Sequence, residues 1–498
     1  MNKTKIEVVI GAQFGDEGKG RTVADIINRE LDLGVTPKEL LNVRFNGGAQ
    51  ASHTVIHNGI RHAHSHYGSG TLQNVQTYLT DKFIVNTMVL NRETRELSEK
   101  GVTPPRVLIS NRAKITTPYE MFANQLIELI NAKKDRHHGS CGLGIHETEW
   151  AYELDRQYRQ SMYDHLIHAI TYLQNSSGDK LHTYDDRVNE MYGLLDQFFN
   201  FKDVTKSAIW QIFIKRVVSQ TDVDEDYILK HGCELLSDGH FVDLPGFVTS
   251  TLYVWIREFG SLNLKFVDDA FLKQTIMSRK YQTIIFEGAQ GLMLDAVYGS
   301  FPHVTCSRTD LTNVQSALES VWNHVSVSVN YVTRCYSTRH GKGPFSNSLT
   351  LDEMQMYGFD IVDETNVSNT FQESMRFALL KHYELVRIIK MSFYPHNINE
   401  FITRATSPIN YGLFKERIFD KIRLVITCAD QFSGKEFPYD CSSNYDASNI
   451  KVAESIESYG KNVLRKELCE GLDLNILNIS NDDVEVIVLS QPHVGSKF

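Results

Sequence analysis

The apolar run "IEVVI" leads directly into a glycine-rich stretch, "GAQFGDEGKGR", which spans residues 11–21. Residues 5–10 predict a buried strand, and the segment "RTVADIINREL" that follows the glycines has the apolar spacing of a helix. The spaced residues are Val23, Ile26, Ile27 and Leu31. A strand, a glycine turn and a helix in this order form a βα unit, which is the building block of folds with a parallel sheet.

Further apolar runs extend this unit into an α/β fold. Runs separated by helical stretches predict a mostly parallel central sheet, whose ligands bind at the carboxyl ends of the strands. The glycine turn after the first strand would then be a P-loop-like nucleotide site. The runs that predict strands lie at 82–90, 106–110, 281–291, 325–331, 421–430 and 484–490.

The pattern changes between about 150 and 280, where strand signals are few. One apolar helical face is formed there by Val188, Met191, Leu194, Leu195, Phe198 and Phe199. We therefore expect residues 1–150 and 281–498 to form an α/β nucleotide-binding catalytic domain. Residues 151–280 are expected to form a mainly helical insertion that packs on it.

The charge and the cysteines narrow the class of protein. The net charge of −10 argues against a protein that binds duplex nucleic acid through a basic face, although a local basic pocket would still accept a small phosphorylated ligand. The seven cysteines contain no CxxC pair, which favours a reducing compartment and argues against a zinc site. No window approaches twenty apolar residues, so a cytoplasmic protein without a membrane span is expected.

The glycine turn has two interpretations. Backbone N–H groups at a strand-to-helix turn bind phosphate, and Lys19 would add a positive charge. The spacing differs from that of a Walker A loop, and a structural turn with solvated Asp16 and Glu17 explains the glycines equally well. Asp16 favours the first interpretation, because a carboxylate repels phosphate unless it holds a metal ion or takes a proton.

This stretch resembles the signature loop of the adenylosuccinate synthetase family, and further motifs follow in the family's order. The segment "FNGGAQASHTV" is similar to the family's second signature, in which a His-Thr pair follows glycines, and "FEGAQGLMLDAVYGSFPHVTCS" is similar to another signature over its whole length. The remaining similar segments are "GSGTL" (68–72), "NTMVL" (86–90), "HHGSCGLGI" (137–145), "YSTRHGKGPF" (336–345) and "ITCAD" (426–430).

The resemblance implies a GTP-dependent ligase that needs Mg²⁺. It implies that the γ-phosphate moves to the 6-oxygen of IMP and that the amine of aspartate then displaces it. By resemblance Asp16 is the base that removes the purine N1 proton and a magnesium ligand, and His53 donates to the phosphoryl group. Lys19 would contact the phosphates, and Gln290 the 6-position of the purine. The alternatives are a helix N-cap for Asp16 and a packing role for His53.

The resemblance also implies the binding residues. Ser140, Cys141 and Thr305 stand where the family contacts the 5′-phosphate of the substrate nucleotide, and Gln50 stands where the family has asparagine. A strand-end hydroxyl is the alternative for Thr305. The main-chain carbonyl of Ser52 would be a second magnesium ligand. The implied GTP-binding residues are Gly15, Glu17, Gly18, Gly20, Arg21, Ser52, Thr54 and Asp430, of which Asp430 would accept hydrogen bonds from guanine.

The family's arginine-rich loop, which grips the two carboxylates of aspartate, has no counterpart here. The corresponding window, 361–380, has Arg376 as its first basic residue. Arg156 is a candidate for the basic residue that a neighbouring subunit lends in the family, whose shared site implies a homodimer. Three hypotheses remain open: a ligase of IMP and aspartate, a related ligase that uses dGMP or another amino acid, and a non-catalytic purine-nucleotide binding protein.

Overall fold

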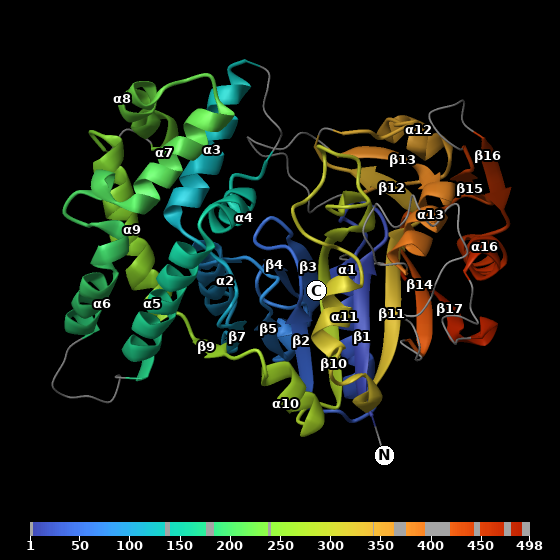
Figure 1. Cartoon of the computed structure of the whole chain (residues 1–498). Helices are drawn as coiled ribbons and strands as arrows, with labels where there is room; N and C mark the ends of the chain where they lie inside the picture. Colours follow the sequence, from blue (N-terminus) through green and yellow to red (C-terminus); the bar gives the residue numbers. More distant parts are fainter. Residues whose placement is uncertain are drawn as a thin grey trace, which may run out of the picture.

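A parallel sheet forms the centre of the molecule (Figure 1). The computed structural model describes residues 3–134, 140–175, 184–237, 241–341, 343–362, 375–393, 419–442, 449–472 and 480–490. Within them, nine strands pair in the order β17-β14-β11-β1-β10-β2-β5-β7-β9, and every neighbouring pair is parallel. The strands are β1 (Thr4–Gly11), β2 (Leu40–Arg44), β5 (Gln76–Leu79), β7 (Val107–Ser110), β9 (Leu264–Val267), β10 (Thr283–Gly291), β11 (Val325–Arg334), β14 (Lys421–Thr427) and β17 (Val484–Val488). The predicted α/β fold with a mostly parallel sheet is confirmed.

The first βα unit lies at the middle of this sheet. Strand β1 is buried over nearly its whole length, and the apolar face of α1 (Lys19–Asp32) packs on the sheet. The packed residues are Val9, Val23, Ile26, Ile27, Val332 and Val425. Other helices of this part are α2 (Thr87–Glu99), α10 (Phe271–Met277), α11 (Thr312–Leu318), α12 (Leu351–Met356), α13 (His382–Ser392), α15 (Ile456–Ser458) and α16 (Arg465–Gly471).

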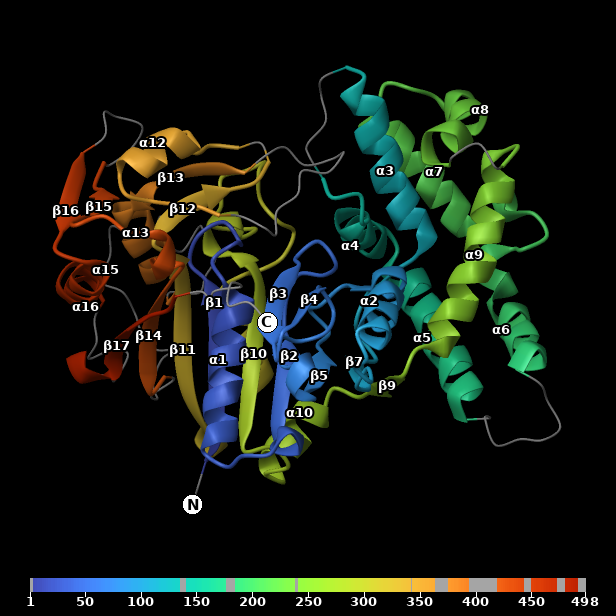
Figure 2. The ribbon, with the colours of Figure 1, turned by 180° about the vertical axis from the view of Figure 1, so that it is seen from behind.

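A group of helices stands beside the β9 edge of the sheet (Figures 1 and 2). It comprises α3 (Pro118–Ala132), α4 (Ile145–Leu154), α5 (Arg156–Asn175), α6 (Tyr184–Phe199), α7 (Ala208–Gln220), α8 (Glu225–Leu236) and α9 (Leu244–Ser261). These helices share an apolar core with α2 and with strands β7 and β9 of the sheet. Helix α3 packs on α7, α8 and α9, although it precedes the expected insertion, and β9 returns the chain to the sheet before residue 280. The division of the chain at residues 150 and 281 stays a prediction. No helix of the described ranges is both long and apolar enough to span a membrane.

Smaller sheets complete the fold. Strands β12 (Tyr336–Arg339), β13 (Arg376–Lys381), β15 (Phe437–Asp440) and β16 (Ile450–Ala453) form a second sheet, and β3 (His53–His57) pairs with β4 (Ile60–His64) as a hairpin. The apolar run 82–90 contains only the short strand β6 (Val85–Asn86), which pairs with β8 (Ile115–Thr116). Helix α2 begins at Thr87 because the side chain of Asn86 accepts a hydrogen bond from the N–H of Val89.

Candidate functional site

Three neighbouring strands bring their following loops together at one edge of the sheet. Strands β1, β10 and β2 end at Gly11, Gly291 and Arg44, and their order in the sheet makes these ends adjacent. The loop after β1 passes close to the end of β10, because a side chain at Gly15 would start 3.2 Å from the Cα of Gln290. Gly15 also has a φ of 110°, which favours glycine. The sequence-predicted loops around Asp16 and Gln290 therefore lie side by side.

Glu17 organises the interior of the first loop. Its Oε1 accepts hydrogen bonds from the N–H groups of Gln13 (2.9 Å) and Gly15 (2.7 Å). Its Oε2 lies 2.7 Å from the Nζ of Lys19, which also donates to the carbonyl of Gly15 at 2.6 Å. Glu17 and Lys19 are both buried. In this structure Glu17 holds Lys19 and the N–H groups of Gln13 and Gly15.

Asp16 faces outward from the same loop. Its Oδ2 lies 3.1 Å from the Nη2 of Arg334, at the end of β11, and 3.8 Å from the Nε2 of His340. Arg334 also donates to the main-chain carbonyl of Asp16. The Asp16 side chain is 30% exposed, so its carboxylate remains accessible to a ligand. The N-cap of α1 is Gly18, with φ of 87°, so the interpretation of Asp16 as the N-cap is wrong.

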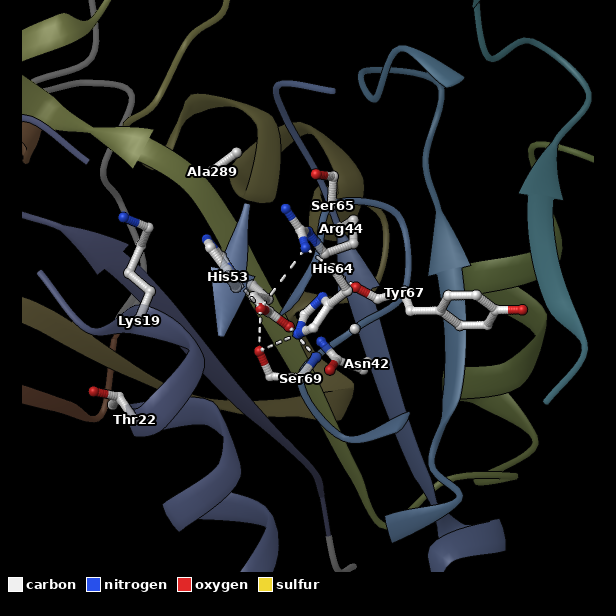
Figure 3. Close-up of polar contacts among 12 residues, drawn as sticks. Lys19, Thr22, Asn42, Arg44, His53, His64, Ser65, Tyr67, Ser69 and Ala289 are labelled. Carbon is white, nitrogen blue, oxygen red and sulfur yellow. Dashed lines mark hydrogen bonds and ion pairs between the residues drawn. The ribbon is translucent and has the colours of Figure 1, made fainter. Parts of the chain in front are cut away.

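His53 is anchored to the sheet through Glu287. The Nδ1 of His53 lies 2.5 Å from Oε1 of Glu287, a fully buried residue of β10. Ser69 donates to Glu287 from its hydroxyl (2.6 Å) and its N–H (2.9 Å), and the Nη1 of Arg44 lies 3.8 Å away. Figure 3 shows His53, Arg44, His64 and Ser69 turned toward one another. These contacts fix the orientation of the His53 ring relative to β10.

The electrostatics favour a neutral histidine beside an ionised carboxylate. Burial, together with the positive charge of Arg44, lowers the pKa of His53 to about 4. Burial alone would raise the pKa of Glu287, but the charge of Arg44 and the hydrogen bond from His53 outweigh it, so that this pKa lies far below its usual range. The Nδ1–H of neutral His53 then donates to Glu287, and its buried Nε2 has no hydrogen-bond partner among the described residues.

The carboxyl end of β10 is hydrogen-bonded to the loop after β2. The Asn46 side chain donates to the carbonyl of Ala289 (3.1 Å) and accepts from the N–H of Ala289 (2.8 Å). Gln290 follows with a φ of 58°, and its buried Oε1 has no hydrogen-bond partner within the described ranges. The Oε1 of Gln50 is likewise buried without a partner in those ranges. Two amide groups of the predicted site thus have hydrogen-bonding capacity that the described residues do not use.

A small apolar cluster joins the loops that carry the remaining substrate-binding candidates. It contains Ala49, Ile84, Val89 and Ile145, with Leu143 and Cys306 packed against it. Gln50, Cys141 and Thr305 are therefore close in the chain to members of one cluster. Ser140 donates its hydroxyl to Asn124 (2.7 Å), and burial raises the pKa of the Cys141 thiol to about 11. Residues 137–139 of this segment lie outside the described residues.

Several of the implied GTP-binding residues lie where the first loop and the start of α1 contact the hairpin and the end of β14. Gly20 packs directly on the hairpin, because a Cβ there would lie 3.2 Å from the Cβ of His53 and 3.3 Å from the carbonyl of Thr54. Ser52 is exposed, and Arg21 pairs along α1 with Asp25. Asp430 is exposed on the short turn after β14, where Thr427 donates to the carbonyl of Glu17 at 2.6 Å.

Arg376 stabilises a loop instead of facing solvent. It pairs across β12 and β13 with Arg339, and it donates to the carbonyls of Gly341 (2.6 Å) and Gly343 (3.0 Å). Arg339 donates to the carbonyl of Pro344 at 2.9 Å, which gives it a structural role. Most of the window 361–380, namely 363–374, lies outside the described residues. Arg156, the first residue of α5, forms an exposed ion pair with Glu153 near the end of α4.

Sequence reasoning missed the residues that support the site. Glu287, Ser69 and Asn46 stood inside the quoted motifs, but nothing in the sequence assigned them partners. The alternation of histidines in "RHAHSH" was a signal that could have been used, since His62 and His64 share one face of β4. Arg334 stands two positions before the motif "YSTRHGKGPF", and no pattern in the sequence indicates its contact with Asp16.

The donor set at Asp16 fits magnesium that is bound mainly by a nucleotide. Among the residues that the structure describes, no three His, Cys, Asp or Glu side chains form a metal-binding group. Mg²⁺ typically takes one or two protein carboxylates and several phosphate oxygens. Asp16 would supply a partly exposed carboxylate, and Ser52, an exposed residue directly before His53, would supply a main-chain carbonyl.

Comparisons with known proteins agree with the motifs. A family model described as "Adenylosuccinate synthetase" matches residues 8–239 and 248–368. The adenylosuccinate synthetase of Clostridium botulinum (strain Alaska E43 / Type E3) is 28% identical over 350 residues, which cover 70% of this chain and 66% of that protein. The adenylosuccinate synthetase of Blochmanniella pennsylvanica is 26% identical over 347 residues, 69% of this chain and 65% of that protein.

A solved structure shares the fold. The fully ligated adenylosuccinate synthetase from Plasmodium falciparum superimposes with a TM-score of 0.53 and 16% sequence identity, covering 99% of this chain and 100% of that chain. The matched part of the present chain spans slightly less than two thirds of the first curated relatives, at 65% and 64% of their length.

Proposed function

Because this chain belongs to the adenylosuccinate synthetase family, we propose that it is a C–N ligase that activates a 6-oxopurine nucleotide with GTP and Mg²⁺. In the proposed reaction the γ-phosphate of GTP moves to the 6-oxygen of IMP, and the amine of aspartate then displaces the phosphate. The observation that carries the proposal is the packing of Gly15 against Gln290, with His53 fastened to the same strand through Glu287. It sets a carboxylate, an amide and a histidine around one edge of the sheet.

The proposed roles follow from the chemistry of these groups. Asp16, which is partly exposed, removes the N1 proton so that negative charge develops on the 6-oxygen. Gln290 has an amide with unused hydrogen-bonding capacity and contacts the 6-position of the purine. His53 presents its Nε2 to the phosphoryl group, whose negative charge favours protonation of the ring as it arrives.

The phosphates and the base are bound by the surrounding loops. Mg²⁺, held by Asp16, by the carbonyl of Ser52 and by the nucleotide itself, would neutralise phosphate charge. Lys19 contacts the phosphates once its ion pair with Glu17 is shared with the ligand, and Asp430 accepts hydrogen bonds from guanine. Gln50, Ser140, Cys141 and Thr305 line the proposed substrate side. The family's shared site makes a homodimer part of the proposal.

The expected binding site for the amino co-substrate lacks suitable arginines, and this favours a second function. Arg376 is the first basic residue of the window 361–380, and it is committed to the carbonyls of Gly341 and Gly343. A dicarboxylate prefers bidentate guanidinium partners, which this window does not supply. This favours a related ligase that uses an amine other than aspartate, or that acts on another nucleotide such as dGMP.

One experiment separates these functions. The purified protein is incubated with GTP, Mg²⁺, IMP or dGMP and a panel of amino acids, and the products are identified by mass spectrometry. A nucleotide–amino-acid adduct is expected, and it should be lost when EDTA removes the magnesium. Release of phosphate without any adduct would contradict the ligase proposal, and neither adduct nor phosphate would indicate a nucleotide-binding protein.

A further inference from the structure

A chain of buried hydrogen bonds leads from His53, on one strand of the hairpin, through Glu287 and Ser69 to His64 on the other strand. Glu287 accepts from His53, from the hydroxyl of Ser69 and from the N–H of Ser69, and Arg44 lies 3.8 Å from the same carboxylate. A carboxylate has about four acceptor positions, so these donors nearly fill its capacity. Behind Ser69, the Nε2 of His64 lies 3.4 Å from the Ser69 hydroxyl. His64 is the direct partner of His53 across β3 and β4.

The protons in this chain can be placed by counting donors. Ser69 has one hydroxyl proton, and the carboxylate of Glu287, at 2.6 Å, is its strongest acceptor. The hydroxyl oxygen can then only accept from His64, so Nε2 of His64 carries a proton. The other nitrogen of His64, Nδ1, is left without a proton, and in the part of the chain that the structure describes it is buried with no hydrogen-bond partner. Burial lowers the pKa of His64 to about 4, in keeping with a neutral ring.

From this arrangement we infer that Glu287 is a positioning residue, supported by Ser69 and His64, that holds His53 in the tautomer with its proton on Nδ1. A carboxylate that accepts from one ring nitrogen of a histidine fixes which nitrogen is free for chemistry. In this chain the free nitrogen is Nε2, which is buried and has no hydrogen-bond partner among the residues that the structure describes, and the Cβ of His53 lies next to Gly20 at the start of α1. Without the carboxylate, either ring nitrogen of His53 could carry the proton, and the ring would lose its fixed orientation.

This inference rests on the proposed function for its effect on turnover, but the tautomer can be measured without substrate. The ¹⁵N chemical shifts of ¹⁵N-histidine-labelled protein report which ring nitrogen carries the proton. The chain has 19 histidines, so the His53 signals are identified by their loss in His53→Asn. The ligand-free protein should show His53 protonated on Nδ1 and not on Nε2.

Glu287→Gln removes the charge and keeps the size of the side chain. Because the amide can donate as well as accept, a measurable fraction of His53 should move its proton to Nε2. The kcat should fall on the order of 10²-fold, with KM for the nucleotides little changed, since binding groups are untouched. Ser69→Ala should shift the same signals in the same direction and by less. It also tests the inference if Glu287→Gln fails to fold.

His62→Asn is the matched control. His62 stands two residues before His64 on β4, stacks on it with ring centroids 5.7 Å apart, and bonds the Nζ of Lys100 at 3.4 Å. This variant should leave the His53 tautomer and kcat as in the wild type. Unchanged His53 signals in both Glu287→Gln and Ser69→Ala would overturn the inference, whatever the activity. If the protein shows the expected His53 tautomers but forms no product, the proposed function is refuted and the positioning role of Glu287 is still supported.

Discussion

The carboxylate of Asp16 lies 3.1 Å from the guanidinium of Arg334, which connects the loop after β1 to the end of β11. The arginine donates to the main chain of Asp16 as well as pairing with its side chain. The main-chain contact holds the loop in place even when the carboxylate changes partner. A side chain held in this way can exchange an arginine for a ligand without a rearrangement of the backbone.

Asp16→Asn should therefore abolish product formation while the nucleotides still bind. The amide keeps the shape of the side chain but cannot remove a proton, so we expect kcat to fall by at least about 10²-fold. Product is measured by mass spectrometry and nucleotide affinity by calorimetry. The matched control is Asp25→Asn, which removes a carboxylate paired with Arg21 further along α1. Activity near that of the wild type in Asp16→Asn would remove Asp16 as the base.

Gly20→Ala should destabilise the protein although alanine is the better helix former. The added Cβ would lie 3.1 Å from the Oγ of Ser69 and 3.2 Å from the Cβ of His53, both of which are held by Glu287. Overpacking of this kind costs about 1–3 kcal/mol, which exceeds the helix propensity gained. The free energy of unfolding is measured by urea denaturation. Gly193→Ala on α6, where nothing lies within 4 Å, should instead be neutral or stabilising by up to about 1 kcal/mol.

Asp430→Asn should weaken the preference for guanine nucleotides. The amide replaces one accepting oxygen by an NH₂ donor that faces a donor of guanine, so affinity for GTP should fall about tenfold or more while affinity for ATP stays low. Competition binding with GTP and ATP measures both. Glu436→Gln, an exposed acid a few residues later, should leave the preference intact. Equal competition by ATP and GTP in the wild-type protein would contradict the proposed role of Asp430.

Acid should weaken the fold through the histidines of the β3–β4 hairpin. Burial lowers the pKa of His53, His62 and His64 from 6.5 to about 4. Arg44, Lys19 and Lys100 oppose protonation, whereas Glu287 and Glu93 favour it. Between pH 6.5 and about pH 4 these histidines bind more protons in the unfolded chain than in the folded protein. The free energy of unfolding is therefore highest above about pH 6.5 and falls as the pH drops toward 4.

This pH dependence can be measured by urea denaturation at about pH 7.5 and about pH 5. Each pKa unit corresponds to about 1.4 kcal/mol, so the loss should reach several kcal/mol for the three groups together. His62→Gln should reduce the difference between the two conditions. His168→Gln, at an exposed position of α5, should leave it unchanged. A stability that is the same at both pH values would contradict the buried, neutral state of these rings.

The sequence predicts best those features that depend on residues close together in the chain. The strand, glycine loop and helix at 5–31 were predicted from periodicity, and the structure forms them as β1 and α1. The motifs around Asp16, His53 and Gln290 also identified loops that converge at one sheet edge. Local patterns suffice for such features because they are set by neighbours in the chain.

Features that depend on contacts across long sequence separations could not be predicted. His53 and Glu287 are 234 residues apart, and their contact depends on the sheet order that places β2 next to β10. The pairing of Lys19 with Glu17 was missed for a different reason, since a loop rich in glycine can turn its charged side chains inward or outward. The run 82–90 was predicted as a strand, but a helix begins within it at Thr87 because the side chain of Asn86 caps that helix.

The two margins of the central sheet have a consequence for self-association. Open strand edges offer unpaired N–H and C=O groups to any other chain, and a nine-strand parallel sheet has two such margins. The marginal strands β9 and β17 are short, with four and five residues, and they carry the charged side chains of Lys265 and Glu485. Short, charged edge strands of this kind disfavour edge-to-edge aggregation, so the chain can return from the group of helices to the sheet at β9 without exposing a strand that pairs readily with another chain.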